Sequence, residues 1–177
     1  MIVTNDSRRA EKAKYLTTQA KDDSVYYLHH EIGYNYRLNN IQAALGVAQL
    51  SRLNDFVRRK KDNYRMYQTQ IKGIDGLYLT PTPPYADNNH WMCALQVDKK
   101  IYGRSRDQLI QSFRKEGVEV RPLWHLNHEQ KPYQGCQSYK IEKAQELLKT
   151  TLNIPSSVGL TKSEIGKVTG LLKTWKR

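Results

Sequence analysis

The sequence predicts an α/β fold. After residue 74, short segments with apolar side chains at every second position alternate with longer segments whose apolar side chains recur at helical spacing. The length of 177 residues allows one ordinary core, or one small domain plus an appendage. The mean hydropathy of −0.77 is strongly polar. That value fits either a charged surface or a piece of a larger fold whose surface is covered elsewhere.

The amino-terminal region combines two short elements with an irregular segment. We expect a short strand over residues 1–5 and a helix over residues 9–18. Residues 19–36 show no periodicity. A structureless segment of this length inside a domain is usually functional or flexible, so this segment is the first place to look for a site.

The clearest predicted element is one long helix over residues 39–73. Asn39 is a good N-cap, and Gln42 three residues later completes a capping box. Gly73 ends the helix. About 30 residues at 1.5 Å each give a length of about 45 Å, so we expect the helix to bridge two bodies. The apolar stripe on one face consists of Ile41, Ala44, Leu45, Ala48, Leu53, Phe56, Val57, Tyr64, Tyr67 and Ile71.

Residues 74–177 form the predicted small α/β domain, after an amino-terminal part at 1–38 and the helix at 39–73. Two further capping boxes, at Ser105–Gln108 and Thr161–Glu164, mark helix starts. The predicted strands are 77–80, 90–97 and 118–120. The predicted helices are 105–116, 141–148 and 161–175, and a loop over 122–135 precedes the second of them.

The chain is basic, with 29 Lys and Arg against 17 Asp and Glu and a formal charge of +12. Basic proteins often bind nucleic acid. Here the charges are spread along the chain, and the densest run, Arg58–Lys61, points in four directions around a helix. We therefore expect no nucleic-acid partner. The alternative, a nucleic-acid module, predicts DNA affinity that falls steeply with salt.

The sequence shows no membrane or metal signal. No apolar run approaches the roughly 18 residues that cross a bilayer, and the amino terminus lacks a signal-peptide core. We expect a cytoplasmic protein without a membrane partner. Cys93 and Cys136 share no metal-ligand spacing and should be free thiols in a reducing compartment. No cysteine or carboxylate completes a zinc site with the histidine pairs.

Asn35 and Arg37 are the first candidate binding residues. They precede a helix start, where unpaired backbone N–H groups and the helix dipole favour anions. An amide and a guanidinium would suit a phosphate there, although both residues could instead order the loop. Similarly, His125 could face a substrate or pack its loop onto the domain. Tyr34 could line a pocket or a dimer contact.

The segment Gly33-Tyr-Asn-Tyr-Arg-Leu-Asn39, with the following Ile-Gln-Ala-Ala-Leu-Gly46, resembles the subunit-interface segment of the DegT/DnrJ/EryC1/StrS sugar aminotransferases, which use pyridoxal phosphate. The likeness continues through Arg-Pro-Leu-Trp-His125 and Leu-Asn-Ile-Pro155 to the carboxyl terminus. It implies the C-terminal part of a fold type I pyridoxal-phosphate-dependent transferase. Residues 1–38 would then be a remnant of the large cofactor-binding domain, followed by the linking helix and the small domain.

The resemblance also implies roles for individual residues. Asn35 would reach across a dimer interface to the phosphate of the partner's cofactor, and Arg37 would lie near that cofactor and the substrate. Tyr34, Arg121 and His125 would bind substrate. The implied reaction moves an amino group from an amino acid, with glutamate as the expected donor, to a nucleotide-linked keto sugar for surface-glycan synthesis. The segments at 17–23 and 30–32 look most like enzymes for UDP-linked 4-keto-6-deoxy amino sugars.

The resemblance assigns no catalytic residue to this chain. In the family, the Schiff-base lysine and the aspartate that pairs with the pyridine nitrogen lie before the position that Met1 matches. We therefore expect a product of a split or truncated gene that is inactive alone. It would work as a homodimer or beside a separate amino-terminal half. The alternative is a non-catalytic interaction module that associates with a full-length aminotransferase. We also expect an exposed apolar patch on the long helix, and hence self-association.

Overall fold

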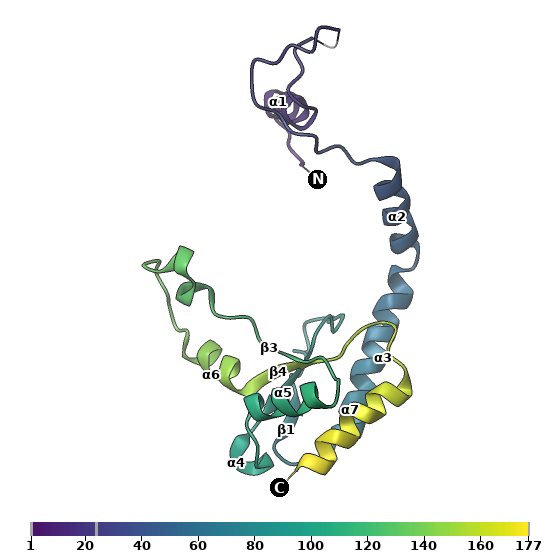
Figure 1. The fold of residues 1–177 in the computed structure, drawn as a ribbon, viewed down its shortest axis with the longest axis vertical. Helices are drawn as coiled ribbons and strands as arrows, with labels where there is room; N and C mark the ends of the chain where they lie inside the picture. The colour runs from purple at the N-terminus through teal and green to yellow at the C-terminus, as the bar shows by residue number, and fades with distance from the viewer. Residues whose placement is uncertain (1, 24, 177) are drawn as a thin grey trace. The chain divides into compact units, whose positions relative to one another are not determined.

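The computed structural model describes residues 2–23 and 25–176. It divides into two compact units, Met1–Arg52 (unit 1) and Leu53–Arg177 (unit 2). Unit 1 contains the helices α1 (Ser7–Thr17) and α2 (Asn40–Ser51), labelled in Figure 1. The helix predicted at 9–18 is thereby confirmed. Whether residues 1–38 are a remnant of a larger domain stays a prediction.

The strand predicted at residues 1–5 is wrong for residues 2–5, and Met1 lies outside the described residues. The chain forms a local turn instead, because the backbone N–H of Asp6 donates to the Thr4 hydroxyl at 3.1 Å. The Asp6 side chain then accepts from the N–H groups of Arg8 and Arg9 and begins α1. An apolar run becomes a strand only where another strand pairs with it, and among the described residues no strand or bridge pairs with residues 2–5.

The continuous helix predicted at 39–73 is also wrong, because α2 ends at Ser51 and α3 spans Leu53–Ile71. Arg52 between them has φ −106° and ψ 3°. The Ser51 hydroxyl donates to the Ala48 carbonyl at 2.9 Å, and such side-chain bonds to the preceding turn often bend helices. The predicted capping box of Asn39 and Gln42 is present.

Unit 2 is built on a four-stranded antiparallel sheet with the order β1-β2-β4-β3. The strands are β1 (Leu77–Leu79), β2 (Cys93–Val97), β3 (Arg121–Pro122) and β4 (Thr151–Ile154). The strand predicted at 118–120 is wrong, because the described backbone pairing begins at Arg121. Val118 and Val120 are both buried, which explains the apolar side chains at alternate positions. Such a pattern shows that the side chains are buried, but it does not require the backbone to pair with another strand. Strand β4 was not predicted, since all four of its residues are buried and no alternation marks it.

Helices enclose the core of unit 2. They are α3, α4 (Lys99–Tyr102), α5 (Arg106–Lys115), α6 (Glu142–Thr150) and α7 (Lys162–Trp175), with 3₁₀ turns at Asn127–Glu129 and Lys131–Tyr133. The capping boxes predicted for α5 and α7 are both present. Helices α3 and α7 lie side by side (Figure 1), and the buried Tyr102 hydroxyl donates to the Leu172 carbonyl at 2.7 Å. No helix among the described residues is long and apolar enough to span a bilayer.

Candidate functional site

The segment from Gly33 to Arg37 in unit 1 is held in place by its backbone. The N–H of Tyr34 donates to the carbonyl of Leu16 at 2.7 Å, and the N–H of Tyr36 donates to the carbonyl of Thr17 at 3.0 Å. Asn35 forms an isolated antiparallel bridge with Thr18. These contacts tie the segment to the carboxyl end of α1, so its side chains project from a fixed backbone.

Side chains alternate across this extended segment. The rings of Tyr34 and Tyr36 stack with centroids 5.3 Å apart and an interplanar angle of 8°, which places both on one side. Because successive side chains in an extended chain point to opposite sides, Asn35 and Arg37 lie on the other side. Both are exposed, and neither side chain has a hydrogen-bond or ion-pair partner within the part of the chain that the structure describes.

Gly33 is required at its position for a steric reason that the sequence pattern did not reveal. A Cβ on Gly33 would lie 2.3 Å from the backbone nitrogen of Ala20, so any side chain would push the two segments apart. Ala20 itself is fully buried. Gln19 and Ala20 both have positive φ values, 74° and 49°, and such strained residues occur often at functional sites.

A polar cluster around Asp22 holds the rest of the loop against α1. The carboxylate accepts hydrogen bonds from the Tyr15 hydroxyl at 2.9 Å and from the backbone N–H of His30 at 2.7 Å. The His30 N–H is the main cause that lowers the pKa of Asp22. Partial burial, together with the bond to Asp22, raises the pKa of Tyr15 to about 12. Among the described residues, no group of three His, Cys, Asp or Glu could hold a metal ion.

The geometry of Asn35 and Arg37 fits a phosphate group. Two donors without partners project from one side of a fixed segment, three to five residues before α2 begins. The backbone N–H groups of Asn39 and Gln42 already donate hydrogen bonds within the capping box. An anion at this position would therefore be bound by the side chains of Asn35 and Arg37. An amide and a guanidinium together can hold several phosphate oxygens.

The other predicted residues in the carboxy-terminal region lie in unit 2. The Nε of Arg121 donates to Glu119 Oε1 at 3.0 Å. His125 Nε2 lies 3.2 Å from Glu129 Oε2, a contact within its own loop. Arg121 lines a pocket of about 790 Å³, whereas His125 is not among the residues that line it. The predicted site residues therefore fall into two groups, one in each unit.

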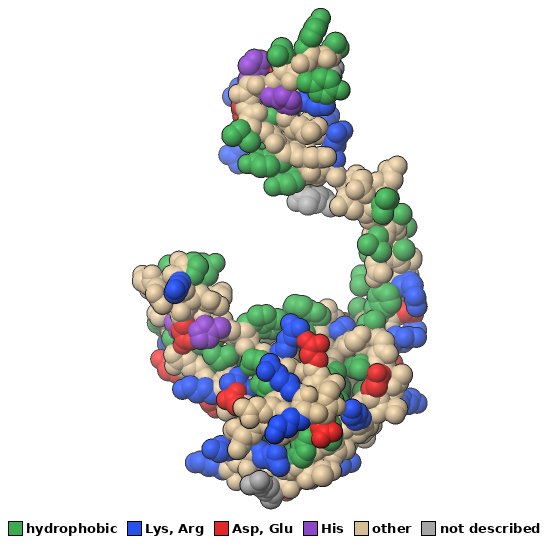
Figure 2. Space-filling model, in the orientation of Figure 1, with side chains coloured by type: hydrophobic (Ala, Val, Ile, Leu, Met, Phe, Trp, Pro, Cys, Tyr) green, Lys and Arg blue, Asp and Glu red, His purple; other side chains and the backbone are tan. Residues whose placement is uncertain are grey.

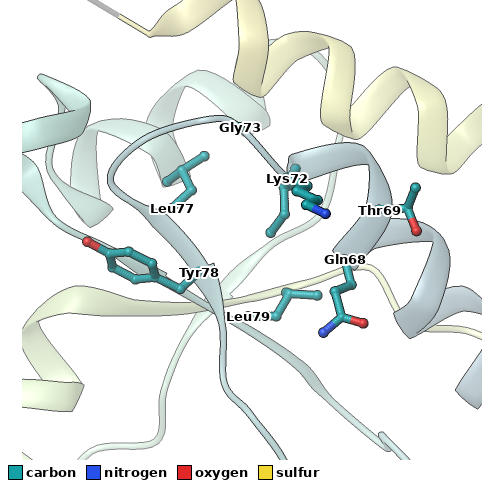
Figure 3. Close-up of a pocket in the computed structure, with 8 residues that line it drawn as sticks. Gln68, Thr69, Lys72, Gly73, Leu77, Tyr78 and Leu79 are labelled. Atoms are coloured by element: carbon teal, nitrogen blue, oxygen red, sulfur yellow. The ribbon is translucent and has the colours of Figure 1, made fainter.

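None of the described lysines is buried, although a Schiff-base lysine must be desolvated. Partial burial lowers the pKa of Lys60, but its ammonium donates to the carbonyls of Trp91 and Ser156 at 3.0 and 2.7 Å. Lys72 lines a shallow pocket of about 550 Å³ along β1 and α3. Figure 3 shows its amine pointing away from the hydroxyl of Tyr78, so the polar groups of that pocket do not converge.

Comparison with known proteins decides the family. The model of the DegT/DnrJ/EryC1/StrS aminotransferase family matches residues 1–173. The chain belongs to this family. The family is pyridoxal-phosphate dependent, and the resemblance carried by the 33–46 segment is confirmed.

Relatives and solved structures agree with this assignment. EpsN of Bacillus subtilis (strain 168), a proposed pyridoxal phosphate-dependent aminotransferase, is 34% identical over 97% of this chain and 45% of its own length. GDP-perosamine synthase of Caulobacter vibrioides is 30% identical over 97% of the chain and 46% of the synthase. The aminotransferase TlmJ of Streptoalloteichus hindustanus has a TM-score of 0.79 at 22% identity, covering 97% of this chain and 45% of TlmJ. At that identity the likeness shows the fold.

The chain spans about half the length of the curated relatives it matches. The mixed helices and sheet are a partial α/β fold of the kind found in aminotransferases of this family. This confirms the predicted fold class, a part of the α/β fold of a pyridoxal-phosphate-dependent transferase. The roles of Tyr34, Asn35, Arg37, Arg121 and His125 stay predictions.

Proposed function

We propose that this chain is the C-terminal part of a pyridoxal-phosphate-dependent sugar-nucleotide aminotransferase. The complete enzyme would move an amino group from an amino acid to a nucleotide-linked keto sugar. The names of relatives such as GDP-perosamine synthase support an amino-sugar product. The bound cofactor would supply the electron sink for amino transfer, and the residues of this chain would hold and orient it.

One observation carries the proposal for the cofactor. Asn35 and Arg37 present two donors without partners on the side of the 33–37 segment opposite the stacked tyrosines. In this proposal the Asn35 amide donates to a phosphate oxygen and Arg37 balances the phosphate charge. Tyr34, Arg121 and His125 are proposed to contact the sugar nucleotide. The sequence predicts a UDP-linked sugar and the name of the Caulobacter relative indicates a GDP-linked one, so both are candidate substrates for the assay below.

Binding of the cofactor can be tested on the full chain by titration calorimetry with pyridoxal phosphate and with pyridoxal. We expect binding of the phosphate form that exceeds binding of the phosphate-free form. Asn35→Ala and Arg37→Ala should each remove most of this preference, whereas Arg8→Ala, an exposed arginine in α1, should leave it unchanged. An unchanged preference in both site variants would refute the assignment.

We expect residues 1–177 on their own to show no turnover, because none of their described lysines is buried and a Schiff-base lysine must be desolvated. The assay would combine the chain, pyridoxal phosphate, glutamate and a nucleotide-linked 4-keto sugar, with a full-length relative as the positive control. Amino-sugar formation by the chain alone would show that one of its own lysines serves the reaction.

A protein partner is the second part of the proposal, because unit 1 exposes many large apolar side chains. Figure 2 shows them along α2 and over the rest of the unit, and they include Val25, Tyr26, Ile32, Tyr36, Leu38, Ile41, Leu45, Val47 and Leu50. We propose that a second copy or a separate amino-terminal half covers them. Sedimentation should show self-association that Ile41→Lys with Leu45→Lys reduces. A wild-type chain that sediments as a monomer would contradict self-association.

A further inference from the structure

Strand β1 forms one edge of the sheet in unit 2. The strand order β1-β2-β4-β3 gives it one neighbour, β2, and no strand or bridge among the described residues pairs with its other side. The opposite edge strand, β3, carries Pro122, which has no N–H to donate. Strand β1 (Leu77–Leu79) contains neither a proline nor a charged residue, two features that commonly block pairing at an edge. This edge can therefore accept a short strand.

The hydrogen bonds between β1 and β2 show which backbone groups face outward. The N–H of Thr80 donates to the carbonyl of Ala94 at 3.0 Å, and these two residues are directly opposite in the register. In an antiparallel pair, residues that bond to the neighbouring strand alternate with residues whose N–H and carbonyl face the other way. The backbone of Tyr78 therefore bonds to β2, and the backbone groups of Leu77 and Leu79 face the open edge.

Three of these outward groups have no partner among the described residues. The N–H of Leu77 donates to the carbonyl of Ile74 at 3.2 Å. The carbonyl of Leu77 and both the N–H and the carbonyl of Leu79 remain. An extended chain beside β1 can accept the Leu79 N–H and donate to both carbonyls, which is the pattern used when a peptide adds a strand to a sheet.

Two grooves adjoin β1, and Tyr78 lines both. The first groove, of about 550 Å³, lies along α3 and is lined by Gln68 and Lys72. The second groove, of about 500 Å³, lies at the starts of α4 and α5 and the end of α6, and is lined by Gln96. Figure 3 shows Tyr78 pointing away from Gln68 of α3. Because side chains of a strand alternate between its two faces, a strand added to β1 would project side chains toward both grooves.

Both grooves contain exposed lysines that have no ion-pair or hydrogen-bond partner among the described residues. They are Lys72 in the first groove and Lys99, Lys100 and Lys149 in the second. The carboxylates of the second groove already have partners within the chain. Asp98 caps α4, and Glu146 accepts from Lys143 at 2.8 Å. The unpaired charges at this edge are therefore positive, and they favour an acidic occupant.

We propose that β1 is a docking site for an extended acidic segment of a partner protein. The segment pairs with Leu77–Leu79 as a fifth strand of the sheet. Its residues opposite Leu77 and Leu79 are acidic and face the groove that contains Lys72, and an apolar residue opposite Tyr78 packs against the ring. A second copy of β1 is disfavoured as the occupant, because it would bring the same lysines together. The site uses no residue proposed for cofactor or sugar binding, so the two proposals can fail separately.

Titration of the full chain with the acetylated and amidated peptide Glu-Val-Glu-Val-Glu-Val-Glu tests the proposal. Isotope labelling of leucine makes the backbone N–H of Leu79 visible by NMR. We expect a saturable shift of this resonance, and hydrogen exchange slower by about tenfold or more at saturation, because the N–H then lies in a strand ladder. Leu152, in the central strand β4, serves as the internal control. A Leu79 resonance that does not respond up to millimolar peptide would overturn the proposal.

Backbone methylation of the peptide separates strand addition from charge attraction. Peptide residues opposite Leu77 and Leu79 turn their N–H groups toward β1, whereas a residue opposite Tyr78 turns its N–H away. Methylation of two glutamate nitrogens should therefore abolish binding, and methylation of two valine nitrogens should preserve it. If the peptide methylated on glutamate binds as tightly as the one methylated on valine, the occupant is not a paired strand and the proposal is wrong.

Charge variants test the choice of an acidic occupant. Lys72→Glu should weaken peptide binding by about 2- to 10-fold, as expected for an exposed ion pair that is reversed. Lys115→Glu makes the same change of charge at an exposed lysine that lines neither groove, and it should have little effect. Thermal melting shows that both variants are folded. Equal weakening by the two variants would contradict the role of Lys72, and equal affinity for the peptide with lysine in place of glutamate would contradict an acidic occupant.

The free chain provides the test of a second copy as the occupant. In the absence of peptide, we expect the N–H of Leu79 to exchange at a rate that does not depend on protein concentration. If its exchange slows as the protein concentration rises, a second copy pairs with β1 and the proposal is wrong.

Discussion

The two units of this chain differ in what holds them together. In unit 2, twenty buried hydrophobic residues form one cluster around the sheet, whereas among the described residues of unit 1 the buried hydrophobic residue is Ala20. Unit 1 is ordered by hydrogen bonds instead. A net hydrogen bond contributes about 0.5–1.5 kcal/mol, and full burial of one Leu or Phe side chain about 1.5–3 kcal/mol. Because the buried apolar cluster lies in unit 2, we expect unit 2 to fold by itself and unit 1 to depend on a partner that covers its exposed apolar side chains.

The largest expected effect comes from a core truncation in unit 2. Phe113 is fully buried, so Phe113→Ala should lower the free energy of unfolding by about 3–5 kcal/mol through lost burial and the cavity left behind. Leu45→Ala, in exposed α2 of unit 1, should change it by less than about 0.5 kcal/mol. Urea unfolding followed by circular dichroism measures both. Equal effects would show that the units share one core.

A substitution at Gly33 should break unit 1 and leave unit 2 intact. In Gly33→Val the new Cβ would overlap the backbone of Ala20. We expect the bonds made by the N–H groups of Gln19, Tyr34 and Tyr36 to open. Their hydrogen exchange should accelerate by about tenfold or more, which corresponds to loss of about 1.4 kcal/mol of protection. The unit 2 amides serve as the internal control, and their protection should not change.

The same capping motif occurs in both units and permits a matched comparison. Thr161→Ala removes the cap of α7, whose buried face belongs to the core, and should reduce the free energy of unfolding by about 1 kcal/mol. Asn39→Ala removes the equivalent cap of α2, which has no described buried residue. It should leave the midpoint of the urea transition unchanged. A shift of similar size in both variants would mean that α2 unfolds together with unit 2.

Acid should weaken the α7 cap. The backbone N–H of Thr161, followed by its hydroxyl, lowers the pKa of Glu164 below its ordinary value of 4.5. A carboxylate with a lowered pKa in the folded state adds stability above pH 4.5 and loses that contribution as the pH falls through the folded-state value. In Glu164→Gln, stability should therefore fall less steeply below pH 4.5 than in the wild type. Parallel profiles would contradict this role.

The smallest expected effect is at Cys93, which reports on the core of unit 2. Burial raises the pKa of its thiol to about 11, whereas Cys136 is exposed. Because the thiolate is the reactive form, iodoacetamide at pH 8 should modify Cys136 and leave Cys93 unmodified until urea unfolds unit 2. Mass spectrometry after brief labelling measures this, and rapid labelling of Cys93 in buffer would show that the core opens readily.

The sequence predicted best those features that depend on residues close together in the chain. The capping boxes at Asn39, Ser105 and Thr161 each start a helix as expected, because the cap and its partner are three residues apart. The burial of the apolar stripe predicted over residues 39–73 follows the prediction only in part. Tyr67 on that stripe is fully buried, yet Ile41 is 83% exposed, because burial depends on whether another segment is there to cover the side chain.

The candidate site residues likewise divide into those that a local sequence motif indicated and those that only distant segments bring together. The motif around Asn35 and Arg37 was visible in the sequence and indicated the family, which the comparisons confirm. The residues Trp91, Arg114 and Asn153, which line the same pocket as Arg121, were not predicted as a group. They come from three distant segments, and no spacing along the chain indicates that strand pairing brings them together.

By itself, therefore, the sequence determined the helix starts, the family and the identity of the polar groups before α2. The tertiary structure alone decided the pairing of β4 between β2 and β3, the break at Arg52 and the close contact of Gly33 with Ala20. The physical reason is the distance along the chain between the residues that interact. Capping depends on neighbours within one helical turn, whereas pairing, burial and steric fit depend on which distant segments meet.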